Sequence, residues 1–306
     1  MPTDHLMEPA VYHAGVEAED ALHLAAENFF TPEEREPREC SLKRKEDFER
    51  VYHEWLPLRN FEWFAKEIVR RAPNQLVRLH GRCVLCDKEQ DFLIQMQDGD
   101  VNWLEQVVCP DCQGNARVRF WVGRLAQEGR DGKSLVLERG SNERNWLFHL
   151  LGERVNLYWQ RTAGQSNKEN GKLNTEHLPY GDASLRMVAS YDFLETLEDP
   201  IPALKEAARV LQPGGKLLLH TLFDANALQT VDRTVRRDGE PFSESGLWYR
   251  DPDIQERELS LVWKVFGWDV LDTIRACGFR EACCRTHYSI NYGYMGYLPL
   301  WIEAIR

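Results

Sequence analysis

Four of the eight cysteines in this 306-residue chain form two Cys-x-x-Cys pairs. Cys83 and Cys86 make the first pair, and Cys109 and Cys112 make the second after 22 intervening residues. Two residues between thiols let both sulfurs approach one ion, and two such pairs supply the four soft ligands of a tetrahedral zinc site. We predict a structural Zn²⁺ here, since four sulfurs leave no coordination position for a substrate.

Two other interpretations of these cysteines stay open, a redox dithiol and four unconnected core residues. A redox pair normally precedes a helix in a thioredoxin-like unit, and the chain has no such pattern. The apolar runs Phe92–Ile94 and Val107–Val108 instead predict a small antiparallel ribbon between the pairs. The remaining cysteines have no ligand spacing and are expected to be ordinary buried residues: Cys40, Cys277, Cys283 and Cys284.

The second chemical feature lies between Lys133 and Phe223, where predicted strands alternate with helices. Strands are expected at Ser134–Leu137, Val155–Trp159, Leu185–Ser190 and Lys216–Leu222, and helices at Glu143–Arg154 and Pro200–Leu211. This alternation predicts a parallel sheet with helices on both faces. Ligands bind such sheets where the first strand turns into its helix, which here is the turn from Glu138 to Asn142.

Several segments occur in an order typical of one family. Leu178-Pro179-Tyr180-Gly181-Asp182-Ala183-Ser184-Leu185 is followed by Asp192-Phe193-Leu194-Glu195 and by Arg209-Val210-Leu211-Gln212-Pro213-Gly214-Gly215-Lys216. Together they resemble the S-adenosylmethionine-dependent methyltransferases with a Rossmann-like, seven-stranded sheet. The carboxyl third continues the resemblance with a helix at Phe266–Cys277, Gly278-Phe279, a strand through Cys283 and a last strand at Leu298–Ala304.

The resemblance covers roughly residues 80–306 and implies a set of cofactor-binding positions. These are Glu138, Gly140, Ser141, Trp159, Gln160, Asn174, Thr175 and Tyr191. The chain departs from the family pattern at several positions. Asn142 and Arg144 stand where further glycines are expected, and Gln160 stands where a carboxylate usually holds the ribose. Thr196 and Arg186 replace a histidine and an aspartate of the pattern.

The resemblance also implies methyl transfer by in-line attack on a sulfonium methyl group, with a general base where the acceptor must lose a proton. We expect Tyr191, Asp192 and His220 to act in catalysis, since they lie at the ends of predicted strands, and Glu195 lies nearby. A satisfied polar residue is the alternative for His220, and a helix cap for Asp192. Tyr249 and Tyr288 are weaker substrate-side candidates.

The expected function is therefore methyl transfer to a small molecule. A sugar or natural product is favoured as acceptor by analogy, because cysteine-knuckle modules precede such domains in bacterial members linked to sugar and glycan metabolism. The alternatives are a degenerate methyltransferase fold that binds a metabolite or a protein partner without catalysis, and a pocket used for another reaction.

The amino-terminal third is expected to be helical at Val16–Phe29, Lys43–Trp55 and Asn60–Arg71. Phe48, Val51 and Tyr52 share one apolar stripe, and Phe61, Phe64 and Ile68 share another. The charged, proline-punctuated stretch Thr31–Arg38 predicts a surface loop. We expect three parts: a helical segment (1–75), a zinc-ribbon-like module (76–122) and the methyltransferase-like α/β domain (123–306).

Bulk composition limits the partners. An apolar fraction of 43% and ten tryptophans predict a folded core, and a formal charge of −11 argues against nucleic acid. The basic set Arg70, Arg71, Arg78 and Arg82 is expected to be a solvated face. No apolar run approaches the roughly 20 residues that cross a bilayer, and the start lacks a signal sequence. We expect a cytoplasmic protein that does not contact membranes.

Overall fold

The computed structural model describes residues 18–72, 77–94, 96, 100–138, 155–159, 175–250, 261–296 and 299–306. The chain divides into two compact units, each assembled from three stretches. The first comprises Met1–Glu39, Tyr52–Gly123 and His287–Pro299, and we call it the ribbon unit. The second comprises Cys40–Val51, Arg124–Thr286 and Leu300–Arg306, and we call it the sheet unit.

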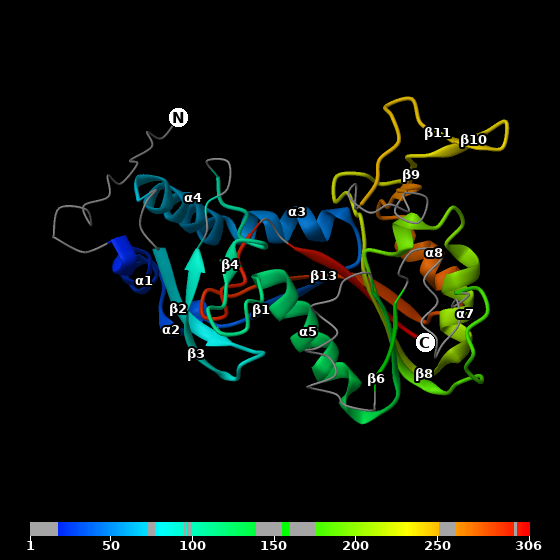
Figure 1. The fold of residues 1–306 in the computed structure, drawn as a ribbon, viewed down its shortest axis with the longest axis horizontal. Coiled ribbons are helices and arrows are strands. Elements are labelled where there is room, and N and C mark those ends of the chain that lie inside the picture. Colours follow the sequence, from blue (N-terminus) through cyan, green and yellow to red (C-terminus); the bar gives the residue numbers. More distant parts are fainter. Residues whose placement is uncertain are drawn as a thin grey trace. The chain divides into compact units, whose positions relative to one another are not determined.

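The sheet unit is built on a seven-stranded sheet with the order β1-β13-β14-β8-β7-β5-β6. Its strands are β1 (Arg38–Leu42), β5 (Ser134–Glu138), β6 (Val155–Trp159), β7 (Leu185–Tyr191), β8 (Leu211–His220), β13 (Glu281–Tyr288) and β14 (Leu300–Ile305). β6, β5, β7 and β8 are parallel, whereas β14 is antiparallel to β8 and to β13 (Figure 1). The predicted α/β sheet and its closing strand pair are confirmed.

The strand β1 was not expected, because its sequence Arg-Glu-Cys-Ser-Leu is too polar for a buried strand. It lies at the end of the sheet order beside β13, and only Leu42 among its residues is buried. Polar and charged side chains are the usual composition of an edge strand. The seventh strand of this sheet therefore comes from the amino-terminal stretch.

Pro213–Gly215 is part of β8, whereas the predicted strand began at Lys216. Gly214 has a φ of +75°, and its N–H donates to Arg306 O at 3.0 Å. Nη1 of Arg186 donates to Gly214 O at 2.7 Å. These bonds hold the glycine turn against the neighbouring strands, and the β7–β8 register shifts between Leu185 and Met187 at the same place.

The helices of the sheet unit differ from expectation at their ends. They are α3 (Lys45–Glu54, which ends in the ribbon unit), α7 (Ile201–Val210) and α8 (Val270–Ala276), with single turns of 3₁₀ helix at Gly129–Asp131 and Leu194–Thr196. Ile201, the first residue of α7, is 40% exposed. The buried face of α7 is formed by Leu204, Ala207, Ala208 and Val210. The helix predicted at Glu143–Arg154 lies outside the described residues.

The segment before α8 explains why this helix begins at Val270 and not at Phe266. The Phe266 N–H donates to Leu222 O at 2.9 Å, and the Trp268 N–H donates to Ala227 O at 3.1 Å. These bonds tie Phe266 and Trp268 to other segments, and the helix begins only after the turn at Trp268 and Asp269. The connection from β8 to α8 also contains short strands: β9 (Val231–Asp232), β10 (Val235–Arg237), β11 (Glu240–Phe242) and β12 (Lys264–Val265). The β10–β11 hairpin extends away from the sheet (Figure 1).

A buried ion network crosses the antiparallel half of the sheet. Glu303 of β14 is only 3% exposed, and one of its oxygens accepts a bond from Arg285 at 2.5 Å. Its other oxygen lies 3.3 Å from Lys216 and 3.5 Å from Arg124. Burial alone would raise the pKa of Glu303, but Arg285 and Lys216 outweigh it and lower the pKa. The carboxylate therefore stays charged and links β8, β13 and the last turns of α5 (Ala116–Glu128).

The ribbon unit contains a three-stranded antiparallel sheet, in the order β2-β3-β4. Its strands are β2 (Val77–Cys83), β3 (Lys88–Ile94) and β4 (Val107–Val108), and its helices are α1 (Ala18–Phe29), α2 (Pro32–Arg35), α4 (Leu56–Arg71) and the start of α5. Leu93 pairs with Val108 and Ile94 with Val107, which confirms the predicted ribbon (Figure 1, cyan).

Local sequence signals explain two differences in the helices. The stretch predicted as a loop contains α2, because Thr31 and Glu34 form a reciprocal capping box. Helix α4 begins at Leu56, four residues before the predicted start, with a proline in its first turn. The predicted stripes are confirmed in part. Phe48, Val51, Phe61 and Ile68 are buried, whereas Tyr52 and Phe64 are half-buried.

The connection between β13 and β14 completes the ribbon unit. The Asn291 N–H donates to Arg35 O at 3.1 Å, and the Arg82 N–H donates to Asn291 O at 2.7 Å. Gly293, at a φ of +60°, packs so closely that an added Cβ would lie 2.9 Å from the Phe92 ring. This stretch late in the chain is therefore part of the cysteine ribbon's packing.

Arg119 of α5 is the largest fully buried side chain. Its guanidinium donates to Tyr292 O at 2.7 Å, Gly114 O at 3.2 Å and Val107 O at 3.3 Å. The guanidinium carbon Cζ of Arg119 lies 3.8 Å from the centre of the Phe92 ring. Burial lowers the pKa of Arg119, although nearby cysteines oppose this. One cation thus joins the second cysteine pair, the ribbon and the β13–β14 connection.

We predict that Arg119→Met lowers the free energy of unfolding by about 3 kcal/mol, because each of three buried carbonyls left without a donor costs about 1 kcal/mol or more. Urea denaturation of the full chain measures the change. Arg44→Met is the matched control, because the Arg44 side chain is 74% exposed. A loss below about 1 kcal/mol for Arg119→Met would contradict this role.

Candidate active site and cysteine cluster

The carboxyl ends of four parallel strands bring several predicted site residues to one edge of the sheet. The pairing places the backbone of Glu138 beside Trp159 and that of Tyr191 beside His220. Ser190 pairs with Leu137, one residue before Glu138. Because strands of this kind bind ligands at their carboxyl ends, this edge is the candidate active site.

The cofactor positions are only partly described. Gly140, Ser141, Gln160 and Asn174 lie outside the described residues, as do Asn142 and Arg144. Thr175 lies in a half-buried turn, and Tyr191 is 6% exposed at the end of β7.

The structure brings the three predicted catalytic residues together. Nδ1 of His220 lies 2.8 Å from Oδ1 of Asp192, and the Asp192 N–H donates to His220 O at 2.9 Å. The Tyr191 ring stacks on the His220 imidazole, with centroids 4.6 Å apart and an angle of 18° between planes. The imidazole is thus held by an aromatic ring on one side and a carboxylate at one nitrogen.

Asp192 has a φ of +51°, which is unusual for a residue with a side chain. The Asp192 carboxylate does not cap a helix, which was the alternative role expected for it. The short helix Leu194–Thr196 has Phe193 at its N-cap and no side-chain capping bond. The Asp192 carboxylate instead contacts His220 and Arg250. Strained backbone at such a position is often retained because it aims a functional side chain.

Three further residues complete the cluster around Asp192. Nη2 of Arg250 donates to Asp192 at 2.9 Å, and its Nε donates to Glu195 at 2.7 Å. The other oxygen of Glu195 accepts from the Thr221 hydroxyl at 2.7 Å. Glu195 is fully buried, so the arginine and the hydroxyl satisfy a carboxylate that has left water.

Sequence reasoning noted Glu195 and missed Arg250 and Thr221. Thr221 had a weak signal, because it directly follows His220 at a strand end. Arg250 had no sequence signal, because the short strands β9 to β11 separate it from the sheet in the sequence. Tyr249 precedes Arg250 and bridges to Leu261. Tyr288 belongs to the ribbon unit, where its hydroxyl donates to Leu58 O at 3.4 Å.

The arrangement suits proton abstraction. When Nδ1 of His220 carries the proton that it shares with Asp192, Nε2 presents a lone pair. The His220 side chain is 27% exposed, so a substrate can reach it. Asp192 therefore holds the Nδ1 side of the imidazole, and Arg250 holds Asp192 in place.

The four predicted metal-ligand cysteines converge in the ribbon unit. Their sulfurs all lie within 4.8 Å of one another, with Cys83 to Cys112 at 3.8 Å and Cys86 to Cys109 at 3.7 Å. Four sulfurs about 2.3 Å from one zinc ion would lie about 3.8 Å apart, so the cluster has zinc dimensions. Among the described residues no other cysteine joins such a group.

The two cysteine pairs have the same local geometry. The Asp87 N–H donates to Cys83 O at 2.8 Å, and the Gln113 N–H donates to Cys109 O at 3.0 Å. Asp87 and Gln113 each follow the second cysteine of their pair, with φ values of +54° and +59°. Of the other four cysteines, Cys277 and Cys284 are buried as predicted, whereas Cys40 and Cys283 are half-buried.

A search for membrane-spanning segments gave a negative result. None of the described helices is both long enough and apolar enough to cross a bilayer.

Comparison with known proteins supports the sheet unit's resemblance. The family model described as "Methyltransferase domain" matches residues 153–219. A search of curated proteins found no match.

Solved structures of methyltransferases are similar at low identity. An S-adenosylmethionine-dependent methyltransferase of Mesorhizobium loti is 14% identical, with 64% of this chain and 100% of that chain covered and a TM-score of 0.40. One from Thermotoga maritima is 14% identical, with 61% of this chain and 90% of that chain covered and a TM-score of 0.31. One from Aquifex aeolicus is 15% identical, with 60% of this chain and 87% of that chain covered and a TM-score of 0.32.

These TM-scores are low, so the assignment depends on the matched segment and on the strands themselves. The segment covers β6, β7, α7 and most of β8. The parallel strands, the glycine turn and the closing antiparallel pair follow the order that the sequence predicted. Residues 153–219 therefore match a methyltransferase domain, and the sheet unit has the parallel strands and the closing antiparallel pair expected of the Rossmann-like fold.

Proposed function

We propose that this protein transfers a methyl group from S-adenosylmethionine to a small-molecule acceptor, with His220 as the general base. The observation that carries this proposal is the pair formed by His220 and Asp192 at the carboxyl edge, fixed by Arg250 and Glu195. A base is needed where the acceptor is a hydroxyl or a protonated amine. A sugar or natural product fits that description.

One feature of the edge fits a bound cofactor. Oγ of Ser190 is buried and has no hydrogen-bond partner among the described residues, and Ser190 is paired with β5 just before Glu138. S-adenosylmethionine would supply the activated methyl group. The positions that would hold it are those expected from the sequence: Glu138, Gly140, Ser141, Trp159, Gln160, Asn174, Thr175 and Tyr191.

The chain's own residues have distinct roles in this mechanism. Nε2 of His220 takes the proton of the acceptor, while Asp192 holds Nδ1 and stabilises the charged ring. Arg250 fixes Asp192 and keeps the buried Glu195 neutralised. Tyr191 limits rotation of the imidazole by stacking on it.

We also propose that the four-cysteine cluster binds Zn²⁺ in a structural role. The sulfur separations and the matched turns support this, and a closed four-sulfur site has no position for a substrate. Binding energy for the ion would be partly folding energy of the ribbon unit.

We predict that the protein binds S-adenosylmethionine and its demethylated product in calorimetric titrations, with dissociation constants at or below the order of millimolar. The non-catalytic alternative makes the opposite prediction. If neither compound produces saturable heat, the methyltransferase proposal fails and a metabolite- or partner-binding role replaces it.

His220→Asn and Asp192→Asn are expected to lower kcat by about 10²–10⁴, because each removes part of the base. Release of the demethylated cofactor is measured with sugars and phenols as acceptors. The dissociation constant for S-adenosylmethionine should change little, which separates loss of the base from loss of the fold. His80→Asn is the control, since His80 is half-exposed in the ribbon unit. Full kcat in both active-site variants would exclude His220 as base.

Purified full-length chain should contain about one equivalent of zinc, and chelation should lower its Tm. Cys86→Ala should lose the metal. Cys40→Ala should retain it, because Cys40 lies outside the cluster. Metal content well below one equivalent after gentle purification, with no response of the Tm to added zinc, would refute a structural site.

A further inference from the structure

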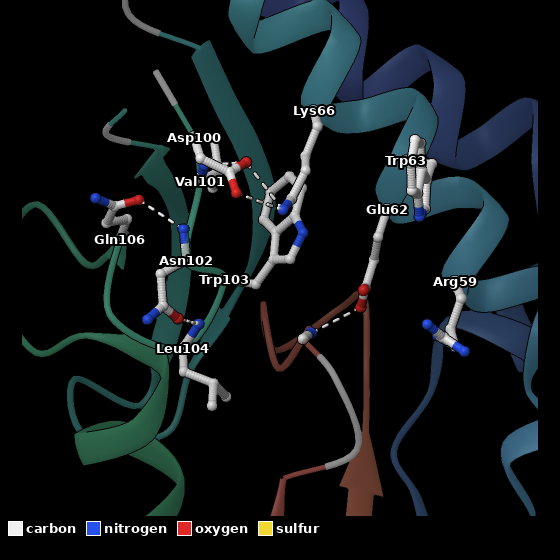
Figure 2. Close-up of a pocket in the computed structure, with 11 residues that line it drawn as sticks. Arg59, Glu62, Trp63, Lys66, Asp100, Val101, Asn102, Trp103, Leu104 and Gln106 are labelled. Atoms are coloured by element: carbon white, nitrogen blue, oxygen red, sulfur yellow. Dashed lines mark hydrogen bonds and ion pairs between the residues drawn. The ribbon is translucent and has the colours of Figure 1, made fainter. Parts of the chain in front are cut away.

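The ribbon unit contains a cavity that the proposed methyl transfer does not use. Its volume is about 530 Å³, within the range of small-molecule sites. It lies between α4, the loop 100–106 and Gly296 (Figure 2), and we call it the α4 pocket. Glu62, Trp63 and Lys66 of α4 line one side, and Asn102 and Trp103 line the other.

The hydrogen-bond acceptors of the α4 pocket are already engaged within the chain. Asp100 accepts from Lys66 at 2.9 Å and from the Val101 N–H at 2.8 Å. The side-chain oxygen of Asn102 accepts from Leu104 N, and that of Gln106 accepts from Asn102 N. Oε1 of Glu62 accepts from the Gly296 N–H at 2.6 Å (Figure 2). A ligand that mainly donates hydrogen bonds would therefore find few acceptors.

In contrast to these engaged acceptors, one buried hydrogen-bond donor of the pocket has no acceptor among the described residues. Trp103 is 4% exposed, and its indole Nε1 has no hydrogen-bond partner among the described residues. In Figure 2 this nitrogen is on the side of the ring that faces α4. A buried donor without an acceptor is costly, so an acceptor supplied by a ligand would relieve that cost.

The charge of the α4 pocket depends on Glu62. Burial raises the pKa of the Glu62 carboxyl to about 7, although the Gly296 N–H, the Tyr288 hydroxyl, Arg59 and Lys66 act in the opposite direction. Asp100 is the other acid among the described residues that line the pocket, and it pairs with Lys66. With Glu62 protonated, these lining residues carry two positive charges, on Arg59 and Lys66, against the one negative charge of Asp100. The neutral carboxyl is then itself a hydrogen-bond donor.

We propose that the α4 pocket binds a small organic carboxylate, whose oxygens accept from the Trp103 indole and the Glu62 carboxyl and whose apolar part packs on Trp63. The 71% exposure of Trp63 leaves an aromatic surface available at the pocket. Lys66 contributes positive charge beside Trp103. This site lies in a different unit from the methyltransferase edge, and it does not rest on the function proposed there.

The first test compares three probes with the same phenyl body. Calorimetry of the full-length zinc-loaded chain is performed with phenylacetate, phenylacetamide and phenethylammonium. We expect saturable binding of phenylacetate, amide binding about tenfold weaker because the charge-assisted bonds are lost, and no ammonium binding. Preferential binding of the ammonium probe would show a cation site and overturn the proposal. Absence of saturable binding of phenylacetate would also overturn it.

Protonation gives a second readout. A bound carboxylate favours the neutral form of Glu62, so its binding is strongest below pH about 7 and weakens by up to about tenfold per pH unit above it. Titrations in buffers with different ionisation enthalpies should show proton uptake at pH 7.5. Proton release, or affinity that rises with pH, would contradict the assignment.

Two variants separate binding from folding. Trp103→Phe removes the unpaired donor and part of the aromatic ring, so we expect about tenfold weaker phenylacetate binding and a modest fall in Tm from the smaller ring. Glu62→Gln should keep binding but remove its pH dependence. Trp248→Phe, in the sheet unit and 42% exposed, is the control. Unchanged affinity in Trp103→Phe, or retained pH dependence in Glu62→Gln, would refute the proposed contacts.

Discussion

The buried guanidinium of Arg119 joins three backbone segments that are far apart in the sequence. Its bonds reach Gly114 after the second cysteine pair, Val107 in the ribbon and Tyr292 between β13 and β14. A cation without solvent requires such partners, so the three segments cannot move independently. The cysteine cluster, the ribbon and the β13–β14 connection are therefore one structural unit, even though the first two lie between β1 and β5 of the large sheet in the sequence and the third lies between β13 and β14.

The same physical constraint shapes the sheet unit. Glu195 at the active-site edge and Glu303 in β14 are both buried carboxylates, and each is satisfied by an arginine from another element. At Glu303 the network holds strands and a helix together. At Glu195 it positions Arg250, which in turn holds Asp192 against His220. Burial of charge thus provides rigidity in one place and aims a reactive imidazole in the other.

Features that depend on residues close together in the sequence were predictable, whereas features that depend on contacts between distant residues were not. The strands β5 to β8 and the cysteine ribbon were predictable, because periodicity and ligand spacing are local signals. Tyr191, Asp192 and His220 were found because parallel strands end at one edge. Strand β1 was missed because an edge strand needs no apolar period, and Arg250 was missed because tertiary packing alone brings it to Asp192.

The route of the chain between β13 and β14 constrains the order of events during synthesis. The four cysteines emerge from the ribosome about 180 residues or more before Asn291, Tyr292 and Gly293, which complete their surroundings. Contacts of such long sequence separation form slowly and expose unfinished surfaces meanwhile. A nascent chain would therefore hold its four cysteines in an open ribbon until the β13–β14 connection has been made. Completion of the ribbon and closure of the large sheet then depend on the synthesis of the same segment.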